Sequence, residues 1–272
     1  MIKNLDNEGL RSIVKNYDFF FIDLWGVIHN GIRLYKNAIK TLIEISNAEK
    51  NYVLLTNAPR PNNAVKIFLA KMGMDKSILE KVYTSGEASL NYLKKNHFKD
   101  KFFHIGPPRD FDLFLDFKNN KKENINDCSY FLCTGLFDKH DQDLNYYKEL
   151  LNKFISKKMI CTNPDLLVDR GKKREFCAGS VAMVFEKMGG QVVYFGKPFP
   201  EVYNQAMDNY KKNILAIGDN LNTDIKGANN MNYDSMIIAN GIHKEEIQKD
   251  GIDKVSKNYE VTVNFIQSEL KW

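Results

Sequence analysis

The chain has 272 residues, of which 43% are apolar and 27% charged, and its formal net charge is +5 at pH 7. These values are ordinary for a globular protein that buries one large core or two smaller ones. No apolar run approaches the roughly 18 residues that a membrane-spanning helix needs, and residues 1–6 lack the apolar core of a signal peptide. Basic and acidic residues are mixed along the chain. We therefore expect a cytoplasmic protein that binds neither nucleic acid nor membranes.

Four cysteines occur, and no pair has the two-residue spacing of zinc or redox motifs. In the absence of a secretory signal, reduced thiols are expected. Most of these cysteines should therefore act as small apolar core residues. They are Cys128, Cys133, Cys161 and Cys177.

The N-terminal part of the chain predicts alternating helices and strands. Apolar residues at helical spacing indicate helices, and short continuous apolar runs indicate strands buried on both faces. In chain order we expect a helix over residues 5–16, a strand over 19–22, a helix over 38–48, a strand over 52–57 and a helix over 62–72. This alternation predicts a parallel sheet with right-handed crossovers.

The same rhythm continues toward the C-terminus. Three further strands and a helix come first, and then three strands, of which two lead into charged residues; the tail from residue 245 is helical in parts. The expected strands cover residues 102–106, 130–133, 159–162, 192–195, 214–218 and 235–239, and the expected helix covers 181–188.

Asp23 directly follows the apolar run over residues 19–22, and Gly26 three residues later allows a sharp turn. Ligands of open α/β sheets bind outside the carboxyl ends of the strands. A single aspartate at such a place can equally open a turn or cap a helix. The interpretation of Asp23 therefore depends on the residues that end the other strands.

Four predicted strands end in polar residues, which should converge on one edge of a parallel sheet. Carboxylates held together need a cation to offset their repulsion, and Mg²⁺ binds through one or two carboxylates plus water or substrate oxygens. A lysine supplies a point charge for phosphate, while threonine and asparagine can donate hydrogen bonds to phosphoryl oxygens. The sequence therefore predicts a magnesium and phosphate site. Its residues are Asp23, Thr56 with Asn57, Lys197, and Asp219 with Asp224 close behind.

These motifs resemble those of the haloacid dehalogenase superfamily of phosphohydrolases. Asp23, Thr56, Gly-Lys-Pro at residues 196–198 and the Gly-Asp-Asn to Thr-Asp segment at 218–224 come one after another in the family's order. Together with Asn-Pro-Asp at 163–165, their wording is similar to the class IIA branch, the NagD-like and 4-nitrophenylphosphatase-like enzymes.

The resemblance implies a Rossmann-like α/β core with an inserted α/β cap domain. The interval 57–197 is long enough for such a cap. We expect the core to comprise residues 1–83 and 187–272 and the cap to comprise 84–186. Within the cap, Asp165 is interpreted as a turn residue rather than a catalyst. Homodimerisation through the cap is expected only by analogy with this branch.

The resemblance also implies roles for the converging residues. Asp23 would be the nucleophile and form an aspartyl-phosphate. Asp23, the backbone carbonyl of Trp25 and Asp219 would hold Mg²⁺, and Asp224 would orient the metal shell. Lys197 would fix Asp23 and the phosphate. The implied activity is Mg²⁺-dependent hydrolysis of a small phosphorylated metabolite.

Trp25 departs from the family's pattern. Phosphatases of this family usually carry a second aspartate at this position, which protonates the leaving group and then activates water. An indole N–H donates a hydrogen bond but is no general acid or base. Loss of such a group typically costs on the order of 10²–10⁴-fold in rate.

Three explanations of Trp25 stay open. The leaving group needs no acid, as with acyl phosphates, or another residue such as His29 supplies the proton. Alternatively, the chemistry differs, as in the dehalogenase and phosphonatase branches, although Asp219 and Asp224 favour phosphate and magnesium. The third possibility is a phosphate-ligand binder or phosphorylated sensor with little turnover.

Overall fold

A computed structural model describes residues 2–170, 173–207 and 213–272 of the chain. The chain divides into two compact units, which are described one at a time. The first unit comprises residues 1–56, 66–83 and 197–272, and the second comprises residues 57–65 and 84–196.

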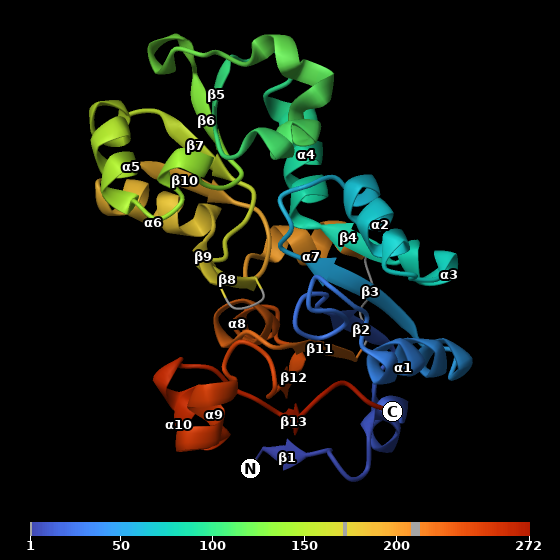
Figure 1. Cartoon of the computed structure of the whole chain (residues 1–272). Coiled ribbons are helices and arrows are strands. Elements are labelled where there is room, and N and C mark those ends of the chain that lie inside the picture. Colours follow the sequence, from blue (N-terminus) through green and yellow to red (C-terminus); the bar gives the residue numbers. More distant parts are fainter. Residues whose placement is uncertain (1, 171–172, 208–212) are drawn as a thin grey trace. The chain divides into compact units, whose positions relative to one another are not determined.

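A seven-stranded sheet forms the centre of the first unit (Figure 1). Its order is β1-β13-β12-β11-β2-β3-β4, and the pairs from β1 through to β3 are parallel. The strands are β1 Lys3–Asn4, β2 Phe19–Ile22, β3 Asn51–Thr56, β4 Val82–Thr84, β11 Ile214–Gly218, β12 Asp234–Ile238 and β13 Phe265–Gln267. This parallel sheet with helical connections confirms the predicted α/β fold.

The central strand β2 pairs with a neighbouring strand on each side. All four of its side chains are buried, as expected of an apolar run that faces helices on both sides. The chain continues from β2 to β3 on one side, whereas β11 pairs with β2 on the other. Such a change of direction opens a crevice at the carboxyl ends of the strands, where α/β proteins bind ligands.

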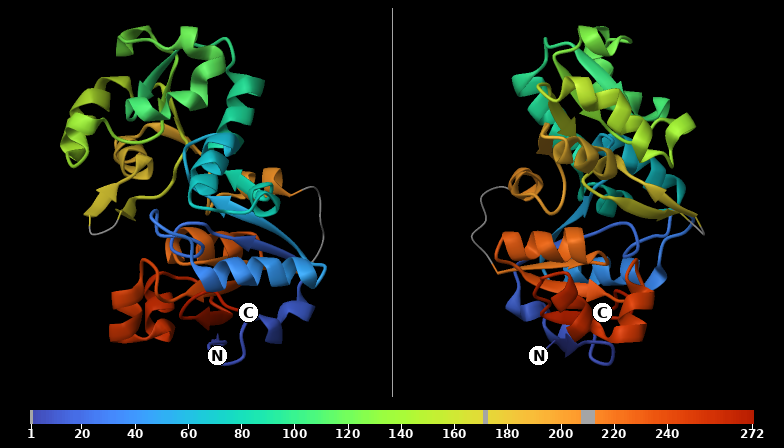
Figure 2. Two further views of the ribbon diagram at one scale, coloured as in Figure 1. Left: turned by 45° about the vertical axis from the view of Figure 1, so that its right-hand side comes forward. Right: turned by 90° about the vertical axis from the view of Figure 1, so that its left-hand side faces the viewer.

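Helices connect the strands of the first unit. Helices α9 and α10 lie side by side in both views of Figure 2. Helix α2, Asn62–Lys71, begins in the second unit and continues into the first. The others are η1 Leu10–Ser12, η2 Val14–Asn16, α1 Lys36–Asn47, α3 Lys76–Leu79, α7 Pro200–Ala206, the π-helical turn η7 Leu221–Ile225, α8 Lys226–Asn230, α9 Lys244–Asp250 and α10 Ile252–Asn258.

The second unit contains a four-stranded parallel sheet of order β10-β7-β6-β5 and an antiparallel hairpin of β8 and β9. Its strands are β5 Phe102–Ile105, β6 Tyr130–Cys133, β7 Lys158–Cys161, β8 Leu167–Arg170, β9 Lys173–Phe176 and β10 Gln191–Tyr194. Its helices are α4 Ser85–Asn96, η3 Pro108–Asn120, η4 Ile125–Asp127, η5 Asp138–His140, α5 Leu144–Leu151, η6 Asn152–Phe154 and α6 Ala178–Lys187.

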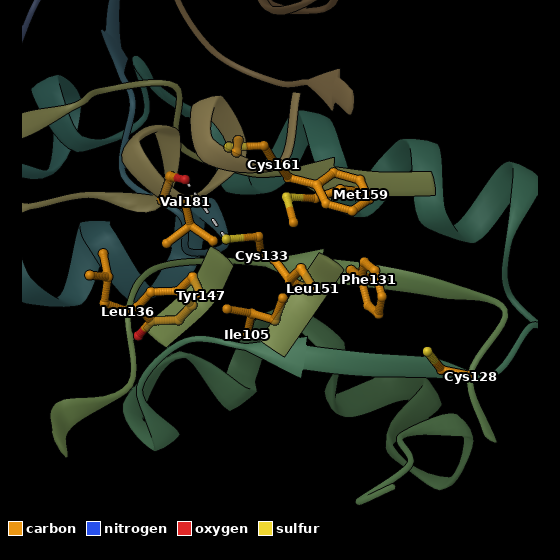
Figure 3. Close-up of a cluster of buried hydrophobic side chains, with 13 residues drawn as sticks. Ile105, Cys128, Phe131, Cys133, Leu136, Tyr147, Leu151, Met159, Cys161 and Val181 are labelled. Carbon is orange, nitrogen blue, oxygen red and sulfur yellow. Dashed lines mark hydrogen bonds between the residues drawn. The ribbon is translucent and has the colours of Figure 1, made fainter. Parts of the chain in front are cut away.

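Helices α5 and α6 pack on this smaller sheet and form its hydrophobic core. Figure 3 shows Tyr147 and Leu151 of α5 and Val181 of α6 gathered against Phe131 and Met159 of the strands. All four cysteines are buried free thiols, as expected for small core residues.

Two predictions about elements need correction. The strand that precedes Lys197 was expected in the sheet that carries Asp23, but β10 pairs with β7 in the smaller sheet. For this reason residues 187–196 lie in the second unit rather than in the core, and residues 57–65 also lie in the second unit.

The expected helix over residues 5–16 does not form: strand β1 ends at Asn4, just before this segment, and the segment itself contains two short 3₁₀ turns. Strand β1 pairs with β13, and the N–H of Leu5 donates to the carbonyl of Ile266 at 2.9 Å. The hydrogen bond of Leu5 thus ties the first residue of the segment to β13. Among the described residues, every helix is too short or too polar to cross a lipid bilayer.

Candidate active site

Asp23 is placed by the central strand. It follows β2 directly, is 8% exposed, and donates its backbone N–H to the carbonyl of Ile217 on β11 at 2.9 Å. Thr56, the last residue of the neighbouring strand β3, is equally buried. Because β2, β3 and β11 are parallel, the residues at their carboxyl ends lie at one edge of the sheet.

Two further carboxylates lie beside Asp23. Asp219 is the first residue after β11, and Asp224 lies in the π-helical turn η7. The N–H of Ile242 donates to Oδ2 of Asp219 at 3.0 Å, and the N–H of Asn220 donates to Oδ2 of Asp224 at 3.1 Å. Carboxylate oxygens of the three aspartates lie within 4.8 Å of one another, and all three side chains are buried. The structure thus brings together the three acidic residues predicted to converge.

Lys197 joins this cluster from the segment after β10. Its Nζ donates to Oδ1 of Asp23 at 2.5 Å, to Oδ1 of Asp224 at 2.6 Å and to the backbone carbonyl of Leu55 at 2.9 Å. Burial alone would lower the pKa of this ammonium group, but the charges of Asp224 and Asp23 outweigh burial and raise the pKa. Lys197 is therefore charged and fixed by three hydrogen bonds.

The charges in the cluster do not balance. In the described part of the cluster, three carboxylates face the single ammonium group of Lys197. Burial, and after it the charges of Asp23 and Asp224, raises the pKa of the Asp219 carboxyl well above its ordinary value. A divalent cation would offset the excess negative charge, and clustered carboxylate oxygens are ligands that suit Mg²⁺. The residues present therefore fit a magnesium ion.

Two glycines make this close arrangement possible. Gly26 has φ +78°, and a Cβ atom there would lie 2.1 Å from Oδ2 of Asp219. A Cβ atom at Gly218 would lie 2.0 Å from Cγ of Asp224. A Cβ atom cannot approach another atom so closely. The carboxylates of Asp219 and Asp224 therefore occupy space that a side chain at Gly26 or Gly218 would fill.

Trp25 is half-buried in the loop after Asp23. A Cβ atom at Gly31 would lie 2.6 Å from Cη2 of the indole, so the six-membered ring lies against the Gly31 backbone. The N–H of Gly26 donates to the carbonyl of His29 at 2.9 Å, and the side chain of Asn30 accepts from the N–H of Arg33 at 3.0 Å. These bonds fix the loop that carries the indole.

His29, the alternative proton donor, is enclosed in this loop and only 3% exposed. Its ring contacts the edges of Trp25 and Phe68, with centroids 5.1 and 6.0 Å away. Its Nδ1 accepts the N–H of Gly31 at 2.9 Å. Burial lowers the pKa of His29 to about 4, so the ring is neutral at pH 7. This environment does not favour His29 as a general acid.

Asn57 belongs to the second unit, although it comes directly after Thr56 in the chain. It is buried, and its amide donates to Oδ1 of Asp165 at 3.0 Å. The backbone N–H of Asp165 donates in turn to Oδ1 of Asn163 at 3.0 Å, which is a turn contact. The phosphate-binding roles of Thr56 and Asn57 stay predictions.

Two backbone groups of the cluster were missed in the sequence. The carbonyl of Leu55 accepts from Lys197, and the N–H of Ile242 donates to Asp219. Backbone groups leave no residue-type signal. The only available pointer was Gly241, where a Cβ atom would lie 2.2 Å from Oδ2 of Asp219.

Two family models match this chain. One, described as haloacid dehalogenase-like hydrolase, covers residues 20–117, and a HAD-hydrolase-like model covers residues 194–262. Together they span more than half of the chain. The chain belongs to the haloacid dehalogenase-like hydrolases. The matched segments of this HAD-like hydrolase contain the whole acidic cluster and Lys197, and the predicted family is confirmed.

Curated relatives match most of the length of this HAD-like hydrolase. Phosphoglycolate phosphatase 2 of Arabidopsis thaliana is 24% identical over 94% of this chain and 93% of the relative. An acid sugar phosphatase of Staphylococcus epidermidis is 26% identical over 86% of this chain and 92% of the relative.

Solved structures match the fold of this HAD-like hydrolase. A haloacid dehalogenase-like hydrolase from Brucella suis 1330 superposes with a TM-score of 0.81 at 29% identity, covering 97% of this chain and 99% of that one. A 4-nitrophenylphosphatase from Thermotoga maritima gives a TM-score of 0.72 at 22% identity, covering 95% and 96%. The second structure therefore supports the fold alone.

Proposed function

We propose that this HAD-like hydrolase is a phosphatase that hydrolyses a small phosphorylated metabolite with Mg²⁺, through phosphorylation of Asp23. The observation that carries this proposal is the buried cluster of Asp23, Asp219 and Asp224 around Lys197 at the carboxyl edge of the central strands. The relatives named as phosphatases support the reaction class.

In this proposal Asp23, Asp219 and the backbone carbonyl of Trp25 hold Mg²⁺, and Asp224 orients the metal shell. When bound, Mg²⁺ supplies positive charge that offsets the charge of the transferring phosphoryl group. The fit rests on the excess of carboxylates over ammonium groups in the cluster.

The chain's own residues perform the transfer. A carboxylate oxygen of Asp23 attacks phosphorus and forms an aspartyl-phosphate, which water later hydrolyses. Lys197 holds Oδ1 of Asp23 at 2.5 Å and so fixes the orientation of the nucleophile. Thr56 and Asn57 donate hydrogen bonds to the phosphoryl oxygens in this scheme.

The second unit acts, in this proposal, as the family's cap domain, and homodimerisation through it stays a prediction. A phosphorylated organic acid or a sugar phosphate is the substrate class that the names of the relatives suggest. The cytoplasmic location is likewise still a prediction.

One observation favours a second candidate function. Because Trp25 offers no proton donor or base, the chain is alternatively a sensor or phosphate binder that keeps phospho-Asp23 for long periods. A stable phosphoprotein that shows no steady-state release of phosphate from any donor would favour this second function. Repeated Mg²⁺-dependent turnover, even at a slow rate, would count against it.

The test is release of inorganic phosphate from a panel containing phosphoglycolate, sugar phosphates, nucleoside monophosphates and acetyl phosphate. Each is assayed with Mg²⁺ and with EDTA. Asp23→Asn should abolish release, whereas Asp18→Asn, the same change at the opposite end of β2, should preserve it. Release that persists in EDTA or in Asp23→Asn would contradict the proposed function.

A further inference from the structure

The side chains near Asp23 that can donate a proton determine which phosphorylated donors can react there. Cleavage of an alkyl phosphate produces an alkoxide, which needs a proton as it leaves. An acyl phosphate releases a carboxylate, which is stable as an anion. The side chains that the structure joins to Asp23, or that come after it in the same loop, therefore decide between these donors.

Lys197 has no proton to spare in this arrangement. Its three N–H groups donate to Asp23, Asp224 and the carbonyl of Leu55. Transfer of a proton from Lys197 would break the hydrogen bonds that hold the nucleophile. Asp219 and Asp224 are carboxylates within the cluster that fits the metal ion.

Residues 24–29, which directly follow Asp23, offer no better donor. Residues 24–28 contain no titratable side chain. His29 comes next, but its Nδ1 is occupied as the acceptor of the Gly31 N–H, and its ring is enclosed by Trp25 and Phe68. The indole of Trp25 lies against the Gly31 backbone and cannot exchange a proton.

We propose that this enzyme phosphorylates Asp23 from acyl phosphates and similar donors whose leaving group departs without a proton, and that it hydrolyses phospho-Asp23 slowly. This inference rests on the proposed function and restricts its substrates to donors with a stable leaving group, in place of the alkyl phosphates that the names of the relatives suggest. The slow second step is expected because residues 24–28 contain no base to activate water, and His29, the next titratable residue, is enclosed by Trp25 and Phe68.

Atoms and charges balance in both steps. An oxygen of Asp23 forms a bond to phosphorus while the bond between phosphorus and the donor's carboxylate oxygen breaks, and the electron pair leaves with that carboxylate. Water then attacks phosphorus and the bond to Asp23 breaks. The carboxylate of Asp23 is regenerated, and both protons of the water stay on inorganic phosphate, released as H₂PO₄⁻.

The first test compares four donors with Mg²⁺: acetyl phosphate, 4-nitrophenyl phosphate, phenyl phosphate and glycerol 3-phosphate. We expect kcat/KM to fall steeply along this series, with glycerol 3-phosphate slower than acetyl phosphate by on the order of 10²–10⁴-fold. Rapid mixing with 4-nitrophenyl phosphate should show a burst of about one equivalent of nitrophenol per site, followed by a slow phase.

The second test restores a carboxylate next to the nucleophile. Trp25→Asp should raise kcat/KM for glycerol 3-phosphate relative to acetyl phosphate by on the order of 10²-fold and should remove the burst. Trp25→Phe, which also removes the indole but adds no acid, is the matched control and should keep the steep dependence on the leaving group.

Equal use of glycerol 3-phosphate and acetyl phosphate by the wild-type enzyme would overturn the inference and leave the phosphatase function intact. Absence of any reaction that depends on both Mg²⁺ and Asp23, with all four donors, would instead overturn the proposed function. Because the wild-type series decides the question alone, the inference stays testable if Trp25→Asp fails to fold.

Discussion

Lys197 is the residue on which the electrostatics of the site depend. It is 4% exposed and bonds to two buried carboxylates that would otherwise repel each other. When one partner of a buried ion pair is removed, the remaining charge is left buried without a partner. The lysine therefore stabilises the fold as well as positioning Asp23.

Lys197→Met should lower the free energy of unfolding in EDTA by about 3–5 kcal/mol, the typical cost of breaking a buried ion pair. Urea denaturation measures this change. Lys187→Met, at an exposed position on α6, is the control and should change stability by no more than about 0.5 kcal/mol. Equal effects of the two substitutions would show that Lys197 contributes no buried ion pair.

Asp219→Asn should make the metal-free protein more stable, because it removes a buried charge that Asp23 and Asp224 oppose. Its side-chain oxygen can still accept the N–H of Ile242. The same variant should lose the rise in Tm that Mg²⁺ gives the wild-type protein. Calorimetry in EDTA and in Mg²⁺ measures both effects, and a variant that keeps the wild-type response to Mg²⁺ would exclude Asp219 as a ligand.

At this scale the charged residues of the site could be predicted from the sequence, because a carboxylate or lysine after an apolar run stands out. Asp23, Asp219 and Asp224 meet as expected. Lys197 meets them too, but not through a shared sheet as predicted, since its strand belongs to the other sheet. The carbonyl of Leu55 could not be predicted, because every residue has one.

The loop that joins β2 to α1 determines how closely the carboxylates approach. Gly26 adopts φ +78°, where an added Cβ atom would strike Oδ2 of Asp219 at 2.1 Å. Gly73 adopts φ +88° with nothing within 4 Å of such a Cβ atom. Substitution of Gly73 therefore tests backbone strain alone, whereas substitution of Gly26 tests backbone strain together with displacement of Asp219.

Gly73→Ala should cost about 1–2 kcal/mol of stability, the usual penalty for a side chain in the left-handed region. Gly26→Ala should cost more and should also weaken Mg²⁺ binding, because Asp219 must move. Denaturation and titration calorimetry with Mg²⁺ measure the two quantities. If the two variants bound Mg²⁺ equally well, the contact between Gly26 and Asp219 would have no role in metal binding.

Buried strands were predictable at the element scale, and edge elements were not. The run Phe19–Ile22 is apolar throughout and reads as a central strand. Residues 5–16 have apolar spacing that fits a helix, but β1 directly before them pairs with β13, and the N–H of Leu5 also bonds to β13. Tertiary pairing of this kind overrides local spacing, and a single sequence does not reveal it.

At the scale of the whole molecule, the second unit contains a buried acid of its own. Asp110, in the second unit, is 6% exposed, and burial raises the pKa of its carboxyl to about 6, although a hydrogen bond from Thr134 opposes the shift. The folded state therefore binds this proton more tightly than the unfolded state, whose aspartate pKa is about 3.9.

The contribution of Asp110 to the stability of the second unit should consequently be highest below about pH 4. This contribution should fall as the pH rises from about 4 to about 6. The full loss amounts to about 3 kcal/mol. Asp110→Asn should remove this contribution, so the difference in stability between wild type and variant should change between pH 4 and pH 7. An identical difference at both pH values would show that the pKa of Asp110 is ordinary.

A chain of two units could be inferred from the long interval between Thr56 and Lys197, which a single sheet does not need. The exact positions where the chain passes from one unit to the other could not be inferred from the sequence. Strand β10 reads like the other buried strands, and only its pairing with β7 assigns it to the second unit. Which strand pairs with which depends on residues far apart in the chain, and the local spacing of apolar residues does not reveal it.

Every step proposed for this enzyme depends on Asp23 receiving the phosphoryl group. Trapping the phosphorylated residue tests this directly: the enzyme is quenched in acid after mixing with acetyl phosphate and Mg²⁺, acyl phosphates are reduced with borohydride, and the modified residue is mapped by mass spectrometry. We predict conversion of Asp23 to homoserine with Mg²⁺ and none with EDTA. Modification of a different residue, or phosphate release that persists in Asp23→Asn, would contradict the proposed role of Asp23.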